Sequence, residues 1–236
     1  MSVRILSVVA VAGAVSIAAV SPSADEASSA SSSDINANIA VPSQPARLLE
    51  PSLPQQKVAW RFVVDGEGNK ARYRVRERLV GKELDNDAVG ETPKVTGAIA
   101  VDDKGKVIAA ESFFTASLAE LTSDASRRDN YVRRRLLVTD TFPTTTLRIT
   151  EVRGLPSPIP KSGEAKFQLI GDLTVKGVTR PTTWNVTASL NDNVLRGTAA
   201  TRFTFADFSL TQPRVSIVLS VADTIGLEYD FVMTKK

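Results

Sequence analysis

Apolar and polar side chains alternate along most of the chain from residue 57 to its end. In the clearest run, ARYRVRERL, one face carries four arginines, Arg72, Arg74, Arg76 and Arg78, and the other carries Ala71, Tyr73, Val75 and Leu79. Because successive side chains of a strand point to opposite faces, such a run predicts a strand with one polar and one apolar face. Similar alternation occurs in residues 57–64, 166–175, 183–190, 195–205, 214–221 and 225–234.

Short turn sequences, GEGN, DDKG, KSGE and NDN, separate these runs. Consecutive strands joined by short turns pair in antiparallel fashion. About ten such strands, each with one apolar face, need a closed barrel or a sandwich to bury those faces. In the run at 214–221, we expect Val215, Ile217, Leu219 and Val221 to form one buried face.

Residues 117–143 break the alternation and have helical character. Ser126 is a candidate N-cap, with Asp129 placed to favour the first turn. Val132 and Leu136 lie four residues apart and so share one helix face. We predict one helix here, covering one end of the barrel.

An outer-membrane barrel shows the same alternation with its apolar face turned to lipid. Three features oppose that alternative: no paired aromatic girdles mark the strand ends, the chain finishes in Thr-Lys-Lys, and the arginine stripe would need matching carboxylates inside a narrow lumen. Unpaired buried charge is costly. We therefore expect the apolar face to point inward.

Bulky side chains are concentrated on this inward face. Those predicted to line a pocket are Trp60, Phe62, Tyr73, Phe113, Leu147, Phe167, Leu169, Trp184, Phe203, Phe205, Tyr229 and Phe231. They would form the wall of a ligand cavity if the barrel is hollow, and an ordinary core if it is filled. The pattern alone leaves both alternatives open.

Composition excludes several kinds of chemistry. The chain has no cysteine and no histidine, so Ser-His-Asp and Cys-His catalysis and thiolate metal sites are impossible. We assign no catalytic residue and no metal ligand, and expect no cofactor other than a bound lipid. The 29 Lys and Arg nearly balance the 26 Asp and Glu, which does not predict a nucleic-acid partner.

The N-terminal region is predicted to lie outside the barrel. Residues 1–24 contain Arg4 followed by an apolar stretch of about 16 residues, which suits a signal peptide better than a spanning helix of about 20. An uncleaved membrane anchor and a buried core helix are the alternatives. Residues 25–56 are rich in Ser, Ala and Pro and predict a disordered linker, which leaves 57–236 as the barrel domain.

Several motifs of this domain resemble the YceI family of lipocalin-like barrels. The most specific match is the segment GDLTVKGVTRP at 171–181, and others are GAIAVD at 97–102, Arg128-Asp129 followed by Phe142-Pro143, FADF at 205–208 and VADTI at 221–225. Two departures occur: Phe205-Ala206 replaces the common arginine before Asp-Phe, and Ser209 replaces the usual glycine. The resemblance implies an all-β, antiparallel, lipocalin-like barrel of about eight to ten strands.

The resemblance also implies an exported carrier protein that is not an enzyme. It would sequester a polyisoprenoid or similar long amphiphile, such as an isoprenoid quinone, in the periplasm or outside the cell, with a membrane tether if the N-terminus stays uncleaved. A homodimer is a further expectation. The alternatives are a stress-response or interaction barrel without ligand, and a lipid-modifying isomerase or cyclase that uses Glu77 or Glu111 as its acid.

Two basic groups have alternative interpretations. A cluster of arginines would contact anionic lipid at a membrane surface, or would be a solvated helix face with local carboxylate partners. Its members are Arg127, Arg128, Arg133, Arg134 and Arg135. In the motif at 171–181, Lys176 and Arg180 would meet an acidic head group or belong to a solvated hairpin.

Overall fold

The computed structural model describes residues 57–156 and 162–236. Strands dominate: β1 (Trp60–Val64), β2 (Lys70–Leu79), β3 (Asn86–Thr92), β4 (Val95–Val101), β5 (Phe113–Ser117), β6 (Thr122–Ser123), β7 (Thr144–Arg153), β8 (Gly163–Val175), β9 (Val178–Asn191), β10 (Val194–Thr204) and β11 (Val218–Lys235). The helical elements are α1 (Ser126–Tyr131), the π-helical η2 (Val132–Leu137) and two short 3-10 turns, η1 (Ala109–Glu111) and η3 (Ala206–Phe208).

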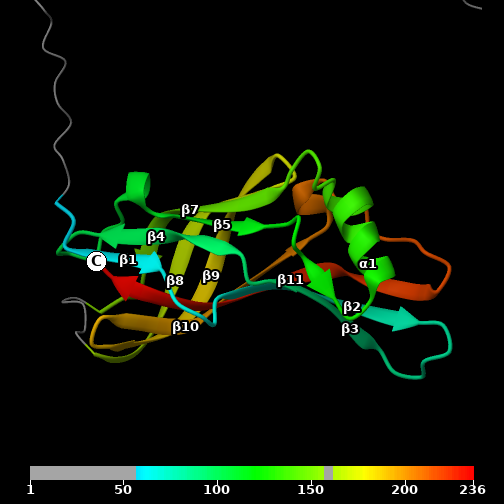
Figure 1. Cartoon of the computed structure of the whole chain (residues 1–236), viewed down its shortest axis with the longest axis horizontal. Helices are drawn as coiled ribbons and strands as arrows, with labels where there is room; N and C mark the ends of the chain where they lie inside the picture. Colours follow the sequence, from blue (N-terminus) through cyan, green and yellow to red (C-terminus); the bar gives the residue numbers. More distant parts are fainter. Residues whose placement is uncertain (1–56, 157–161) are drawn as a thin grey trace, which may run out of the picture. The chain divides into compact units, whose positions relative to one another are not determined.

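One antiparallel sheet of 11 strands contains a closed barrel. The barrel follows the order β1-β4-β5-β7-β8-β9-β10-β11 and closes where β1 pairs with the last residues of β11. The remaining strands, β2, β3 and β6, continue the sheet from the earlier part of β11 (Figure 1). The predicted antiparallel barrel is therefore confirmed, with a three-stranded extension that alternation alone could not distinguish from barrel strands.

The segment at 171–181 is a tight hairpin that joins β8 to β9. Lys176 and Gly177 have φ angles of 48° and 77°, so both central residues of the turn are left-handed. This turn geometry matches the twist of the two strands, and a glycine at the second position suits it. The register then runs unbroken from Val175↔Val178 to Gly163↔Leu190. Arg180 donates to the Asp207 carbonyl oxygen at 2.9 Å, which favours the solvated-hairpin alternative for this residue.

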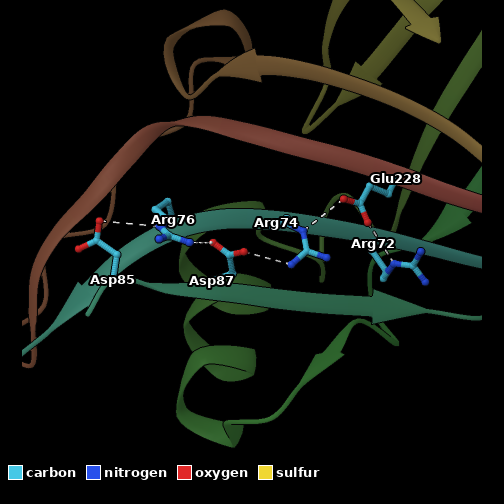
Figure 2. A network of polar contacts seen from close by, with 6 residues as sticks. All are labelled: Arg72, Arg74, Arg76, Asp85, Asp87 and Glu228. Atoms are coloured by element: carbon cyan, nitrogen blue, oxygen red, sulfur yellow. Dashed lines mark hydrogen bonds and ion pairs between the residues drawn. The ribbon is translucent and has the colours of Figure 1, made fainter. Parts of the chain in front are cut away.

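The arginine stripe lies on the outer face of β2, and three of its four members, Arg72, Arg74 and Arg76, are paired with carboxylates of the neighbouring strands (Figure 2). Glu228 of β11 bonds Arg72 and Arg74, at 3.4 and 3.2 Å. Asp87 of β3 bonds Arg74 and Arg76, each at 3.2 Å. The side chains of opposite parity on β2, among them Val75, are buried. The polar face is thus outside and the apolar face inside, as predicted.

This ladder predicts an acid-dependent loss of stability. The hydrogen bond from Arg74 lowers the pKa of Glu228 below its ordinary value of 4.5. A carboxylate with a depressed pKa stabilises the fold above its unfolded pKa, and this contribution is lost as the pH falls through the folded pKa. Glu228→Gln should therefore be less stable than wild type near neutral pH, by a few tenths to about 1 kcal/mol, because the pairs are half-exposed.

The gap between Glu228→Gln and wild type should close as the pH falls below 4.5. Urea unfolding at a series of pH values measures it. Glu164→Gln is the control, since Glu164 is exposed on β8 and has no ion pair within residues 57–156 and 162–236. A gap for Glu228→Gln that is independent of pH would contradict the assignment.

A helical segment is present where the alternation breaks, but its N-cap differs from the prediction. Ala125 caps α1, and Ser126 is the first helical residue and makes no capping hydrogen bond through its side chain. Just before the helix, the Ser123 hydroxyl accepts from the Ala125 N–H at 3.3 Å and donates to the Asp129 carboxylate at 2.6 Å. The prediction of Ser126 as the cap was wrong, because the helix begins at Ser126 and Ala125 occupies the cap position.

The run at 214–221 also departs from the prediction. β11 begins only at Val218, and Val215, Ile217 and Leu219 are 37%, 59% and 62% exposed. Val215 and Ile217 precede Val218, the first residue of β11 that pairs with β2, and Leu219 lies at the register shift between the pairs Val218↔Leu79 and Ser220↔Arg78. Their alternation is that of a buried strand, but regular pairing does not hold their side chains on the inner face. The predicted signal peptide and linker lie outside the described residues. Within the part of the chain that is described, no helix is long and apolar enough to span a membrane.

Candidate functional site

The barrel interior is hollow, with a cavity of about 1530 Å³. This exceeds the roughly 300–1,000 Å³ of pockets for drug-sized ligands. Predicted pocket residues that line it are Tyr73, Leu147, Phe167, Leu169, Trp184, Phe203, Phe205, Tyr229 and Phe231. Of the two alternatives that the sequence left open, the interior therefore matches the hollow barrel and not the filled core.

The cavity opens at one end of the barrel. The exposed residues on its wall come from the β2–β3 turn (81–86), from α1 and the residues before it, and from residues 215–217. These segments lie at the end of the domain away from the C-terminus (Figure 1). Val132 and Leu136, which share the predicted apolar helix face, also line the cavity. The helical segment thus forms one side of the opening.

Three predicted pocket residues do not line the cavity. Phe62 is buried but lies in the core beside Ile99 of β4, and Trp60 stacks on it with ring centroids 6.2 Å apart. Both belong to the packed part of the barrel beyond the cavity. Phe113 lies on the outer face and is 41% exposed. Its neighbour Phe114 points inward instead and meets Tyr229 edge-on at 6.1 Å.

The adjacent phenylalanines explain the error at residue 113. Two equal side chains in sequence carry no alternation, so their parity depends on how the chain leaves η1, which the pattern does not reveal. Wall residues that the sequence analysis missed include Phe114, Leu173, Leu210 and Leu227. Leu173 and Leu227 lie on the apolar face of the alternating runs at 166–175 and 225–234, so the alternation already indicated that they point inward.

Two wall aromatics lie flat because a glycine stands directly opposite on the next strand. Tyr73 pairs with Gly90, and a Cβ at Gly90 would lie 2.6 Å from Tyr73 Cζ. Phe231 pairs with Gly197, where a Cβ would lie 2.7 Å from Phe231 Cζ. Each ring therefore covers its glycine instead of projecting into the lumen, an arrangement that compensates for glycine in a strand. This is one reason why a wall so rich in aromatics leaves the interior open.

Gly90→Ala tests this arrangement. The new methyl group should force the Tyr73 ring off the wall and into the lumen, at a cost of about 1–3 kcal/mol in the free energy of unfolding. Gly226→Ala is the matched control, because a Cβ there meets its nearest atom at 3.7 Å. Chemical denaturation measures both, and equal stability of the two variants would refute the close packing of Tyr73 on Gly90.

One buried ion pair stands in the wall near the opening. Glu77 is 7% exposed and accepts from Arg128 Nη2 of α1 at 2.9 Å. Arg128 also bonds Asp124 and contacts the Ser123 hydroxyl. Burial alone would lower the pKa of Arg128, but Asp124 and Glu77 together raise it, so the guanidinium stays charged. The pair anchors the helical segment to β2 across the opening.

Two tyrosine hydroxyls, of Tyr73 and Tyr229, also belong to the wall. Burial raises the pKa of Tyr73 to about 12. Burial also raises the pKa of Tyr229, whose hydroxyl donates to Asn69 Oδ1 at 2.8 Å. Glu111, the other candidate acid, does not line the cavity and pairs with Arg61 on the surface. Apolar side chains dominate the rest of the wall, so the cavity can bury a long apolar chain.

A family model for the YceI-like domain matches residues 62–233. No curated protein matches the chain. Among solved structures, a polyisoprenoid binding domain from Saccharophagus degradans, described as implicated in plant cell wall breakdown, is similar with a TM-score of 0.55 and 10% identity. The match covers 76% of this chain and 100% of that chain.

Two further structures share the architecture. Burkholderia cenocepacia BcnA has a TM-score of 0.53 and 17% identity over 72% of this chain and 98% of its own. The Campylobacter jejuni YCEI protein has a TM-score of 0.51 and 16% identity over 67% and 90% of the two chains. At such identities the structures establish the fold, and the family model covers nearly the whole described barrel. By this match and its closed antiparallel barrel, the chain belongs to the YceI-like domain family.

Proposed function

We propose that this protein binds a long-chain lipid of the isoprenoid class, such as an isoprenoid quinone, in its barrel cavity and acts as a carrier. The observation that carries the proposal is a hollow apolar interior of about 1530 Å³ that opens at one end. Burying a chain there gains roughly 0.8 kcal/mol for each CH₂ removed from water. The polyisoprenoid binding domain from Saccharophagus degradans, which shares the fold, supports this ligand class.

The two tryptophans provide a direct test, because Trp184 lines the cavity and Trp60 does not. Trp60→Phe leaves Trp184 as the only tryptophan, and Trp184→Phe leaves Trp60. Adding a long-tailed ubiquinone should quench the fluorescence of Trp60→Phe saturably, at one quinone per chain. The emission of Trp184→Phe should change little, and a quinone head group without a tail should not bind either variant.

No saturable quenching of Trp184, or equal quenching of both tryptophans, would overturn the proposal. The isomerase or cyclase alternative is tested in parallel with Glu77→Gln. The carrier proposal expects no chemical change of the added lipid with wild type, whereas the alternative needs product formation that Glu77→Gln abolishes. Because Glu77 is already bound to Arg128, the geometry favours an anchoring role for it.

We further propose that the chain is exported to the periplasm or the cell exterior, with residues 1–24 as the export signal or a membrane tether. The apolar stretch after Arg4 supports this. N-terminal sequencing of protein recovered from a bacterial periplasmic fraction should begin at or near Asp25. Recovery only in the cytoplasmic fraction would contradict export. The expected homodimer also stays a prediction.

A further inference from the structure

Five large apolar side chains are exposed at the open end of the cavity. They are Val80, Leu84, Val215, Ile217 and Leu219, with Leu84 81% and Leu219 62% exposed. Two separate segments bring them together, since the Val80 N–H donates to the Ile217 carbonyl oxygen at 3.0 Å. We call these five residues the apolar lip.

The apolar lip is continuous with the interior. Leu84, Val215 and Ile217 are exposed and also line the cavity, so they connect the solvent-exposed lip with the barrel wall. Contiguous exposed apolar surface of this kind usually marks a site of interaction. A lipid leaving a bilayer could follow these apolar side chains into the cavity.

Positive charge surrounds the lip. Along β2, Arg72, Arg74 and Arg76 are all paired with carboxylates (Figure 2). Arg78, the last arginine of the stripe before the opening, has no carboxylate partner among the described residues. The exposed cations there are Arg78, Lys82, Arg127 and Arg214, and none forms an ion pair within the described part of the chain. Glu83 and the network of Glu77, Asp124 and Arg128 offset only part of this charge. The rim of the opening therefore favours an anionic partner.

We infer that the apolar lip docks on an anionic lipid bilayer, so that the carried lipid passes directly between the bilayer and the cavity. This inference rests on the proposed lipid-binding function. Exposed apolar side chains enter the boundary between head groups and acyl chains while basic residues contact the anionic head groups. The lip is distinct from Arg133, Arg134 and Arg135 of η2, and it supplies the apolar component that an arginine cluster alone lacks.

A single reporter at the lip gives a local test in the full-length chain. The protein has no cysteine, so Ile217→Cys can be labelled uniquely with an environment-sensitive nitrobenzoxadiazole probe. With vesicles of phosphatidylcholine and phosphatidylglycerol, its emission should increase and shift to the blue. Phe113→Cys is the matched control, an exposed apolar position outside the cavity, and its label should not respond.

The charge requirement is tested by vesicle flotation. Arg78→Gln with Lys82→Gln should weaken binding to the anionic vesicles by about fivefold for each charge removed. Lys104→Gln with Lys106→Gln removes the same charge from a turn elsewhere and should leave binding unchanged. All variants keep the same N-terminal segment, so any binding by that segment is common to them.

Each outcome decides the inference. The inference is overturned if the label at residue 217 stays in water in the presence of the vesicles, or if the label at residue 113 responds equally. It is also overturned if analytical ultracentrifugation shows a dimer that Leu84→Ser with Ile217→Ser makes monomeric, because a second copy then covers the lip. Failure of the lipid-binding function is measured in a separate experiment without vesicles. In that case, added ubiquinone does not quench the fluorescence of Trp184.

Discussion

Replacing Ala199 with tryptophan is expected to remove most of the lipid-binding capacity. Ala199 is 5% exposed and lines the cavity. On β10 it lies midway between two other wall residues, Leu195 and Phe203, each four residues away. Its partners across the sheet, Val186 and Tyr229, are wall residues as well. A large ring at this point would divide the bore, and a chain that enters from the open end could not reach the inner part.

The size of the effect follows from the length of chain excluded. The four residue steps from Leu195 to Ala199 span about 13 Å of strand, which corresponds to several CH₂ groups at roughly 0.8 kcal/mol each. We therefore expect affinity for a long-tailed ubiquinone to fall by about 100-fold or more. Ala200→Trp is the control, because Ala200 is the next residue, points outward and is exposed.

Uptake of labelled ubiquinone by the folded variants measures this prediction, with circular dichroism to verify that both remain folded. Equal uptake by Ala199→Trp and Ala200→Trp would show that the lipid does not occupy the bore. A shorter isoprenoid should still bind Ala199→Trp, since the half of the cavity next to the opening stays accessible. Loss of both long and short ligands together would place the binding determinant at the opening instead.

Arg128→Met is expected to cause the largest loss of stability among single changes of charge. It leaves the carboxylate of Glu77, 7% exposed, without its cationic partner. Breaking a buried pair in this way costs about 3–5 kcal/mol in the free energy of unfolding. Adding Glu77→Leu should restore most of that loss, because removing both charges leaves no buried ion unpaired.

Urea unfolding of the single and double variants forms the test. Arg134→Met, in the adjacent exposed turn, is the matched control and should change the free energy of unfolding by less than about 0.5 kcal/mol. A double variant no more stable than Arg128→Met would show that the contact of Arg128 with Asp124 matters more than its pair with Glu77.

Alternation was sufficient to predict the antiparallel strands and the direction of most wall residues, because a strand buried on one side must keep its period. The resemblance to the YceI family then favoured a lipocalin-like barrel over a sandwich. It failed where two like residues are adjacent, at Phe113 and Phe114, and where the pairing of β11 with β2 begins and shifts register, at Ile217 and Leu219. At Phe113 and Phe114 no alternation is present, and at Ile217 and Leu219 the local pattern is the same as that of a correctly predicted strand. The deciding factor is which other strand lies alongside.

The polar part of the site was only half visible in the sequence. Glu77 is recognisable in the sequence as a carboxylate on an apolar face, but its partner Arg128 lies 51 residues away. Arg128 belongs to a cluster of arginines, and nothing in the sequence indicates which of them pairs with Glu77. The flat packing of Tyr73 likewise depends on Gly90, whose position opposite the ring is set by the pairing of β2 with β3. Such pairings across the sheet are fixed by register and are not local properties of the chain.

The central claim is that the hollow barrel is a lipid site, and the lipid content of the purified protein tests it most directly. Protein purified without detergent from a bacterial host should be analysed by native mass spectrometry and by solvent extraction. We expect one long-chain prenyl or related lipid per chain, and recovery of ubiquinone in its place after incubation with an excess of that quinone. A chain that yields no lipid and takes up no added ubiquinone would contradict the account.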